Sequence, residues 1–126
     1  MKIPFAFISD HLFPLETTIK QMFGMFAVYS EDKILFLLRK KTTHPEANGI
    51  WIATKNEYHT SLKKDIPALI SIAYLAEGLN ETEWQLIPEA DDNFENSTIT
   101  LCELIKKKDI RIGKVPKIKR PAKVNK

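Results

Sequence analysis

The apolar positions of the first forty residues predict one short helix followed by an antiparallel group of strands. Pro4 suits a first helical turn and Pro14 cannot continue one, so the helix lies between them. Three apolar runs with the composition of strands follow, at residues 19–23, 25–29 and 33–39. Gly24, between the first two runs, indicates a tight turn, a bulge or a close backbone approach. A hairpin or meander is therefore expected here.

The run from Ile34 to Leu38 is apolar at every position. A strand with apolar side chains on both sides must have both of its faces covered. A further helix, apolar residues of the C-terminal segment or a second subunit could supply the second cover. Homodimerisation is therefore one interpretation of this strand.

The middle of the chain predicts a loop, a strand and a helix. A polar loop over residues 40–49 ends in Asn48-Gly49, a pair typical of tight turns. After a strand at residues 50–53, Thr54 and Glu57 match the capping box that begins a helix. Pro67 then ends this helix.

Two more strands and a last helix complete the expected order. The strands lie at residues 69–75 and 83–87. Asp92 with Glu95 resembles an acidic capping pair, and Phe94, Leu101 and Ile105 fall on one helical stripe. We therefore predict an α+β fold of two layers, an antiparallel β-meander sheet packed by helices, in the order α-β-β-β-β-α-β-β-α.

Length and charge divide the chain into a body and an arm. The 126 residues suffice for one ordinary domain, and 44% hydrophobic with 28% charged residues is a globular balance. Residues 1–105 hold 9 Lys+Arg against 15 Asp+Glu, a charge of −6, whereas residues 106–126 hold 10 against 1, a charge of +9. We expect a folded domain at 1–108 and a basic arm at 109–126.

The candidate chemistry is sparse. His11, His44 and His59 lack the spacing of a metal-binding pair, and the single cysteine, Cys102, is expected to be a small buried apolar residue. We predict no catalytic site, no metal and no cofactor, and hence no enzyme. One cysteine, no signal peptide and no apolar run of membrane-spanning length favour a cytoplasmic protein without membrane contact.

The segment Lys20-Gln21-Met22-Phe23-Gly24, followed by a strand ending at Tyr29, resembles the TfoX/Sxy N-terminal domain family. An aromatic strand from Trp84 to Pro88 and an acidic turn into the last helix match the end of that family's pattern. The resemblance covers residues 3–108 and implies a two-layer α/β fold similar to secretion-chaperone-like and YjbR-like domains, the latter discussed as DNA-associated. It implies no enzyme, and it assigns structural roles to Met22, Phe23, Gly24, Trp84 and Pro88.

The basic arm is the strongest candidate binding segment. Its cations follow one another every one to four residues: Arg111, Lys114, Lys117, Lys119, Arg120, Lys123 and Lys126. Pro116 and Pro121 prevent a regular helix, so the arm should stay extended and hydrated. Extended cations can each meet a phosphate and release its counterions, which allows binding to nucleic acid without reading its sequence.

The predicted function is a non-enzymatic regulatory or binding domain of the TfoX N-terminal type that contacts nucleic acid through this arm. One alternative is a homodimeric protein-interaction module with a solubilising basic tail. A small-ligand-binding protein is a further alternative. The arm could instead clamp onto the acidic body or contact a protein.

Overall fold

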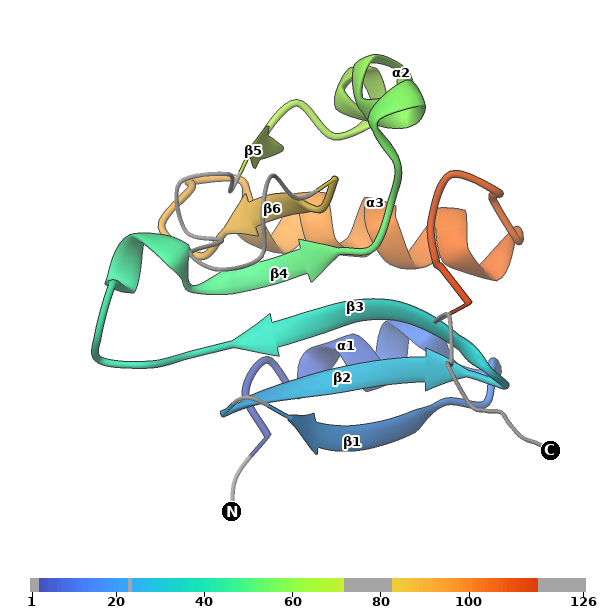
Figure 1. The fold of residues 1–126 in the computed structure, drawn as a ribbon, viewed down its shortest axis with the longest axis horizontal. Coiled ribbons are helices and arrows are strands. Elements are labelled where there is room, and N and C mark those ends of the chain that lie inside the picture. The colour runs from blue at the N-terminus through green and yellow to red at the C-terminus, as the bar shows by residue number, and fades with distance from the viewer. Residues whose placement is uncertain (1–2, 23, 72–82, 116–126) are drawn as a thin grey trace, which may run out of the picture.

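The computed structural model describes residues 3–22, 24–71 and 83–115, and the elements in these ranges occur in the predicted order. Helix α1 (Phe7–Leu12), strands β1 (Thr18–Met22), β2 (Met25–Ser30), β3 (Lys33–Arg39) and β4 (Gly49–Ile52), helix α2 (His59–Asp65), strands β5 (Ile70–Ser71) and β6 (Gln85–Pro88), and helix α3 (Phe94–Lys106) follow one another (Figure 1). Two 3₁₀ turns, η1 (Pro45–Ala47) and η2 (Asn56–Tyr58), flank β4. The predicted α+β fold is confirmed.

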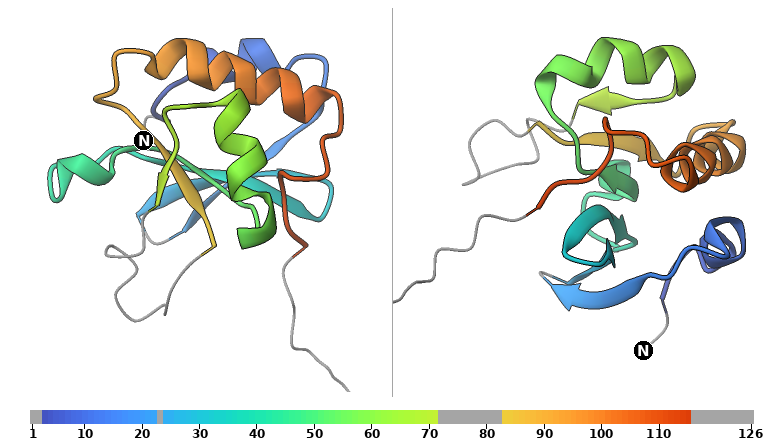
Figure 2. Two further views of the ribbon diagram at one scale, coloured as in Figure 1. Left: turned by 90° about the horizontal axis from the view of Figure 1, so that it is seen from above. Right: turned by 90° about the vertical axis from the view of Figure 1, so that its right-hand side faces the viewer.

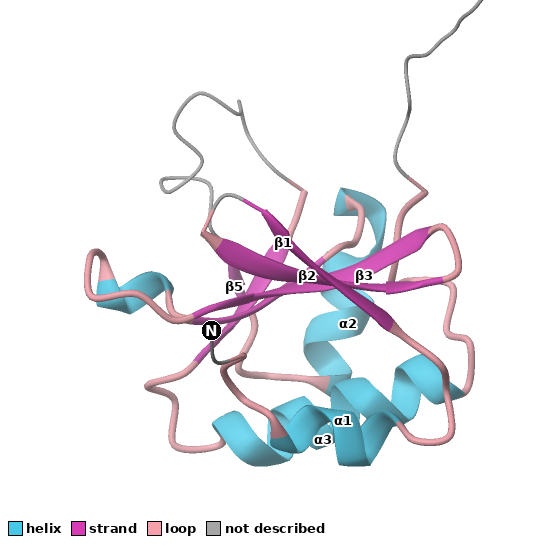
Figure 3. Ribbon diagram, turned by 90° about the horizontal axis from the view of Figure 1, so that it is seen from below, coloured by secondary structure: helices cyan, strands magenta, loops and turns pink. Residues whose placement is uncertain are grey.

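The six strands form one antiparallel sheet in the order β1-β2-β3-β4-β6-β5. Strands β1 to β4 are a meander, as the sequence predicts, because each pairs with the next along the chain. Helices α1 and α3 pack together against one face of this sheet (Figures 2 and 3). The rings of Phe5 and Phe94, 5.2 Å apart between centroids, join the chain before α1 to the start of α3.

The larger part of the core lies between these helices and the sheet. Ile8 and Leu12 of α1 and Leu101, Cys102 and Ile105 of α3 are buried against it. From the strands and α2 come further buried side chains, among them Phe36, Ile50, Ile52, Leu62 and Ile87. Each such side chain stabilises the fold by about 1.5–3 kcal/mol relative to exposure, so this face of the sheet provides most of the burial.

Burial on both faces of the sheet, together with a bulge, explains why the apolar run of β3 does not alternate. Val28 pairs with Phe36 and Tyr29 pairs with Ile34, so Leu35 is an extra residue on the β3 side. Leu35 and Phe36 therefore both belong to the core under the helices, while Ile34 and Leu37 belong to a second cluster. All five side chains from Ile34 to Leu38 are at most 7% exposed within a single chain.

The second, smaller cluster gathers on the other side of the sheet. Its buried members include Met25, Ala27, Trp51, Ala53 and Leu86. Trp51 is held by a hydrogen bond of 2.9 Å from its indole nitrogen to the carbonyl of Ala47 in η1. Met22, Tyr29 and Trp84 pack around this cluster but remain partly exposed. This rim borders the candidate site.

Two predicted helix starts are wrong in detail. The first helix begins at Phe7 and not at Pro4, because Phe5 has a φ of 57° and so leaves the helical conformation. Thr54 does not cap α2; Lys55 precedes η2, and α2 begins only at His59. The hydroxyl of Thr54 is buried, and in the described ranges it is the one buried side-chain polar atom without a hydrogen-bond partner.

The last helix starts without the predicted capping pair. Asn93 is the N-cap of α3 and makes no side-chain capping bond. Asp91, and not Asp92, accepts a hydrogen bond of 2.8 Å from the backbone N–H of Asn93. The acidic turn therefore shapes the entry to α3 one residue earlier than the sequence pattern indicates.

The loop after β3 is organised by Arg39. This buried guanidinium donates to the carbonyls of Thr43 and His44 and to the side-chain oxygen of Asn48, at 2.8–2.9 Å. Burial lowers the pKa of Arg39 from its ordinary value. The predicted turn at Asn48-Gly49 is wrong for Asn48, whose backbone is extended with a φ of −72° and a ψ of 142°. Its side chain holds the loop by bonding the backbone of Lys41.

Some expectations fall outside the described residues. These are the position of Phe23, the continuation of the strand at residues 72–75, and the arm beyond Val115. Within the ranges that are described, none of the helices combines the length and the apolar character needed to cross a bilayer.

Candidate functional site

The first residues of the basic arm form a strap, residues 109–115, that packs onto the body. Figure 2 shows it leaving α3 and passing the strands toward the side of the sheet away from α1 and α3. Ile112 is 1% exposed and belongs to the main core. The strap is therefore part of the folded unit as far as Val115.

Backbone hydrogen bonds hold the strap beside the start of β3. Ile34 and Lys114 exchange two bonds of 2.9 Å as an isolated antiparallel bridge, and the N–H of Gly113 donates to the carbonyl of Ala53 at 2.7 Å. Ile34 can pair with the strap because it lies beyond Phe36, the last β3 residue that pairs with β4. The arm consequently leaves the body at a defined place.

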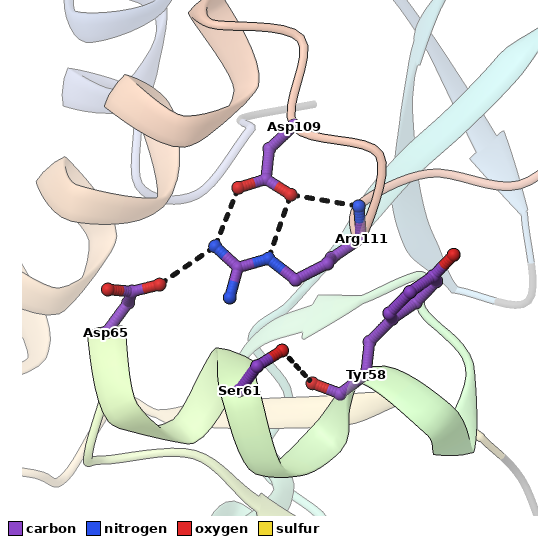
Figure 4. A network of polar contacts seen from close by, with 5 residues as sticks. All are labelled: Tyr58, Ser61, Asp65, Asp109 and Arg111. Atoms are coloured by element: carbon purple, nitrogen blue, oxygen red, sulfur yellow. Dashed lines mark hydrogen bonds and ion pairs between the residues drawn. The ribbon is translucent and has the colours of Figure 1, made fainter.

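Arg111 adds an ion-pair anchor to the strap. Its guanidinium donates two hydrogen bonds to the carboxylate of Asp109, at 2.9 and 2.7 Å, and one of 2.8 Å to Asp65 at the end of α2 (Figure 4). The bidentate contact lowers the pKa of Asp109 and raises the pKa of Arg111. This network ties α2 to the strap.

Lys114 is also engaged with the body, since its ammonium lies 3.2 Å from the carboxylate of Glu83. Arg111 and Lys114 were both predicted to contact nucleic acid. The structure places them in ion pairs within the protein, so their first role is to hold the strap. The other five predicted arm cations lie outside the described residues.

A groove of about 880 Å³ lies where the strap meets the second face of the sheet. One wall is the strap itself, with Gly113, Lys114 and Val115. Three aromatic side chains border the groove from separate segments: Tyr29 at the end of β2, Tyr58 in η2 and Trp84 before β6. Each of the three rings is partly exposed.

The described lining of the groove is predominantly basic. Four cationic side chains, Lys33, Lys55, Arg111 and Lys114, line it with one carboxylate, Glu83, which leaves a formal charge of +3. Within the described part of the chain, no ion pair involves Lys33 or Lys55. These two ammonium groups are therefore the cations of the groove that remain available to an anion.

The residues of the family resemblance are dispersed in the structure. Met22 and Trp84 meet at the groove. Gly24 has a φ of 74° and lies in the turn before β2, as the tight-turn interpretation predicts. Pro88 pairs with Gly49 at the far end of β6, and Phe23 is outside the described residues.

Sequence reasoning did not select Lys33, Lys55 or Tyr58, and it gave Trp84 a structural role only. A signal was present in the predicted meander. In a meander, the end of one strand and the start of the next lie at the same end of the sheet. Tyr29, Lys33 and Lys55 lie at such ends, so the meander alone places them near one another.

The described residues show little further reactive chemistry. Cys102 is buried as predicted, and burial raises the pKa of its thiol to about 12, which opposes thiolate formation. His44 and Glu46 lie 3.5 Å apart on an exposed loop. Across residues 3–22, 24–71 and 83–115, no three His, Cys, Asp or Glu side chains gather as a metal site would require.

In comparisons with known proteins, no family model, no curated protein and no solved structure matches this chain. The TfoX/Sxy resemblance therefore stays a prediction from the sequence. The groove, the strap and the charge of the arm are the features of the chain that bear on its function.

Proposed function

We propose that the protein is a non-enzymatic regulatory or binding domain that contacts nucleic acid through its basic arm and the adjoining groove. The observation that carries this proposal is that Gly113, Lys114 and Val115 form a wall of the groove. The arm therefore starts within a surface that already has cations of its own. An anion bound by the arm would lie next to Lys33 and Lys55.

The five cations beyond the strap supply most of the proposed attraction. Residues 117–126 contain no Asp or Glu, and their basic members are Lys117, Lys119, Arg120, Lys123 and Lys126. Residues 1–105 carry a net charge of −6, which has the same sign as a polyanion. The surface of the body as a whole therefore does not favour binding of a polyanion. Binding is therefore expected to be confined to the arm and the groove.

The TfoX N-terminal-like assignment is part of this proposal. The described fold agrees with the two-layer α/β arrangement that the resemblance implies. That agreement supports the assignment only at the level of fold class, since unrelated proteins share such folds.

The homodimer alternative loses the observation that motivated it. It rested on an apolar β3 needing cover from a second subunit, and Ile34 to Leu38 are buried within one chain. The small-ligand alternative keeps a specific observation in its favour, since a volume of about 880 Å³ lies within the ordinary range of ligand pockets.

The proposal is tested by neutralising the arm in the full-length chain. The variant replaces its five cations beyond the strap by glutamine, and the matched control keeps their charge by exchanging Lys for Arg and Arg for Lys. Binding of a fluorescent 20-base-pair duplex is measured by anisotropy over a salt series. The glutamine variant should lose most of the affinity at low salt, and the charge-retaining control should bind as the wild type does.

Equal duplex binding by the wild type and the glutamine variant would remove the arm from the mechanism. Weak binding by the charge-retaining control would point to recognition of particular side chains instead of charge. Either result would contradict the proposed electrostatic contact.

A further inference from the structure

We infer that the groove beside the strap binds a small organic anion, which is a single phosphate or carboxylate group carried on an apolar body. Lys33 and Lys55 hold the anionic group, and a polar atom of the ligand meets the hydroxyl of Thr54. The site is additional to the proposed contact with nucleic acid, and all of its residues belong to the described body and strap.

The buried hydroxyl of Thr54 is the first observation. Thr54 lines the groove and is 1% exposed, yet its Oγ1 has no hydrogen-bond partner within the protein. Buried polar groups are nearly always hydrogen-bonded, either to the protein or to a bound molecule. Because no hydrogen bond holds this side chain in one rotamer, rotation about χ1 lets the hydroxyl turn toward a ligand. The wall of the groove therefore offers a ligand one polar partner at depth.

Gly113 of the strap brings the two lysines to the same groove. Its N–H donates to the carbonyl of Ala53, the residue before Thr54, and Lys55 follows directly in the chain. A Cβ at Gly113 would lie 2.4 Å from the Cδ of Lys33, so the stem of Lys33 packs on the strap backbone. Lys33 is thus a positioned cation, with its stem fixed by the strap.

The charges of the lining favour a ligand with one anionic group. Among the described cations of the groove, Arg111 and Lys114 are paired with carboxylates of the protein, whereas Lys33 and Lys55 are in no ion pair. Two ammonium groups balance a single phosphate monoester or hold a single carboxylate. The carboxylate of Glu83 lies in the same lining and repels further negative charge.

Apolar side chains supply the surface for the rest of the ligand. Ile34, Ile110 and Val115 line the groove, and the last two are 75% and 59% exposed. The volume of about 880 Å³ is in the range of sites for small organic molecules. A ligand body that covers these side chains gains affinity by removing apolar surface from water. An inorganic anion has no such body, and a neutral ligand has no anionic group for the lysines.

The test uses the full-length protein and three naphthyl probes of similar shape: naphthyl phosphate, naphthoate and neutral naphthol. Amide NMR titrations with the anions should shift the signals of Lys33, Thr54 and Lys55. The neutral probe should bind about fivefold more weakly than the better anion, since it makes no charge-assisted contact. The order of the two anions tells whether the groove prefers a phosphate or a carboxylate.

Three variants locate the site. Lys55→Gln should weaken binding of the better anion by about fivefold. The matched control is Lys64→Gln, which removes the same charge from an exposed position of α2 outside the groove lining and should leave the affinity unchanged. Thr54→Val should weaken binding by about threefold while resistance to urea rises. A merely structural role of Thr54 would move affinity and stability in the same direction.

The outcomes separate this inference from the proposed function. Equal binding of all three probes, or binding of none, would overturn the inference, whereas the role of the arm is decided by duplex binding of its glutamine variant. Unchanged affinity in Thr54→Val would show that the hydroxyl meets only water and would overturn the site as described. Anion binding that is equal in the wild type and the glutamine arm variant supports a site within the body and strap.

Discussion

Thr54 has a buried hydroxyl group that no described neighbour satisfies. Its side chain, two residues after β4, is 1% exposed, and its Oγ1 has no hydrogen-bond partner. An unsatisfied buried hydroxyl costs about 1–3 kcal/mol, whereas an apolar group of the same shape carries no such penalty. Thr54 caps neither η2 nor α2, so its hydroxyl makes no capping hydrogen bond that would offset this cost.

Thr54→Val is expected to raise the free energy of unfolding by about 1 kcal/mol. Thr98→Val is the matched control, because the Thr98 hydroxyl is equally buried but donates to the carbonyl of Phe94 at 2.8 Å. That control should be neutral or lose about 0.5–1 kcal/mol. Urea denaturation of both variants makes the comparison. A loss of stability in Thr54→Val would show that its hydroxyl is bonded in solution.

Asp109 and Arg111 make stability depend on pH through one carboxyl group. The contact with Arg111 lowers the folded-state pKa of Asp109 below the ordinary value of 3.8. The stabilisation is therefore complete above about pH 4 and is lost as the pH falls through the folded-state pKa. Both side chains are less than one-fifth exposed, so solvent screens the pair only in part.

Asp109→Asn should lower the free energy of unfolding at pH 7 by about 1–2 kcal/mol, since it removes charge-assisted hydrogen bonds. Between pH 5 and pH 2 the variant should lose less stability than the wild type. Asp65→Asn serves for comparison, because Asp65 makes a single bond to Arg111 and is 46% exposed. Its effect should be smaller. Denaturation curves at several pH values, parallel for Asp109→Asn and the wild type, would contradict this account.

Strand β4 depends on a close approach that its first residue permits. Gly49 has a φ of 141°, and a Cβ there would lie 2.0 Å from the carbonyl oxygen of Ile87 in β6. The backbone of β6 cannot yield as a flexible side chain could. The glycine of the predicted turn is thus required by pairing between two strands.

Gly49→Ala should destabilise the fold by about 3 kcal/mol or more, from backbone strain and overlap with β6. Gly24→Ala is the control, with a φ of 74°; among the described residues, the atoms nearest to the new Cβ belong to the flexible end of Lys41. It should cost about 1 kcal/mol, since any residue other than glycine pays for a left-handed conformation. Thermal unfolding distinguishes the two variants. Equal shifts of Tm would mean that β6 relaxes around the new methyl group.

For the full-length chain, salt dependence should reveal how the cations are shared between the arm and the groove. Five arm cations in contact with duplex phosphates give a slope of log K against log salt concentration of about −4.5. Lys33 and Lys55 could maintain two contacts in the glutamine variant, which corresponds to a slope of about −1.8. A residual slope near zero would show that the groove does not contact the duplex, and would contradict the part that the proposed function gives to Lys33 and Lys55.

The division of charge remains after the start of the arm docks. Arg111 and Lys114 belong electrostatically to the body, because they are paired with Asp65, Asp109 and Glu83. Docking therefore removes two of the seven predicted cations from the binding arm, and the other five follow the docked strap in the sequence.

Local patterns were sufficient for the order of the elements. Strands β2, β3 and β4 and helix α3 each have apolar runs or stripes long enough to be recognised without knowing their neighbours, so their order could be predicted. Helix starts were predicted less well. At Thr54 the local capping pattern was overridden, because the end of β4 continues into the core.

The docking of the strap and the convergence of the groove could not be predicted in the same way. They depend on contacts between distant residues, such as Arg111 with Asp65 and Lys114 with Ile34. A run of basic residues looks the same in sequence whether its cations meet solvent or carboxylates. Tertiary packing decides which of the two occurs, because burial of Ile112 places Arg111 beside Asp65 and Lys114 beside Glu83.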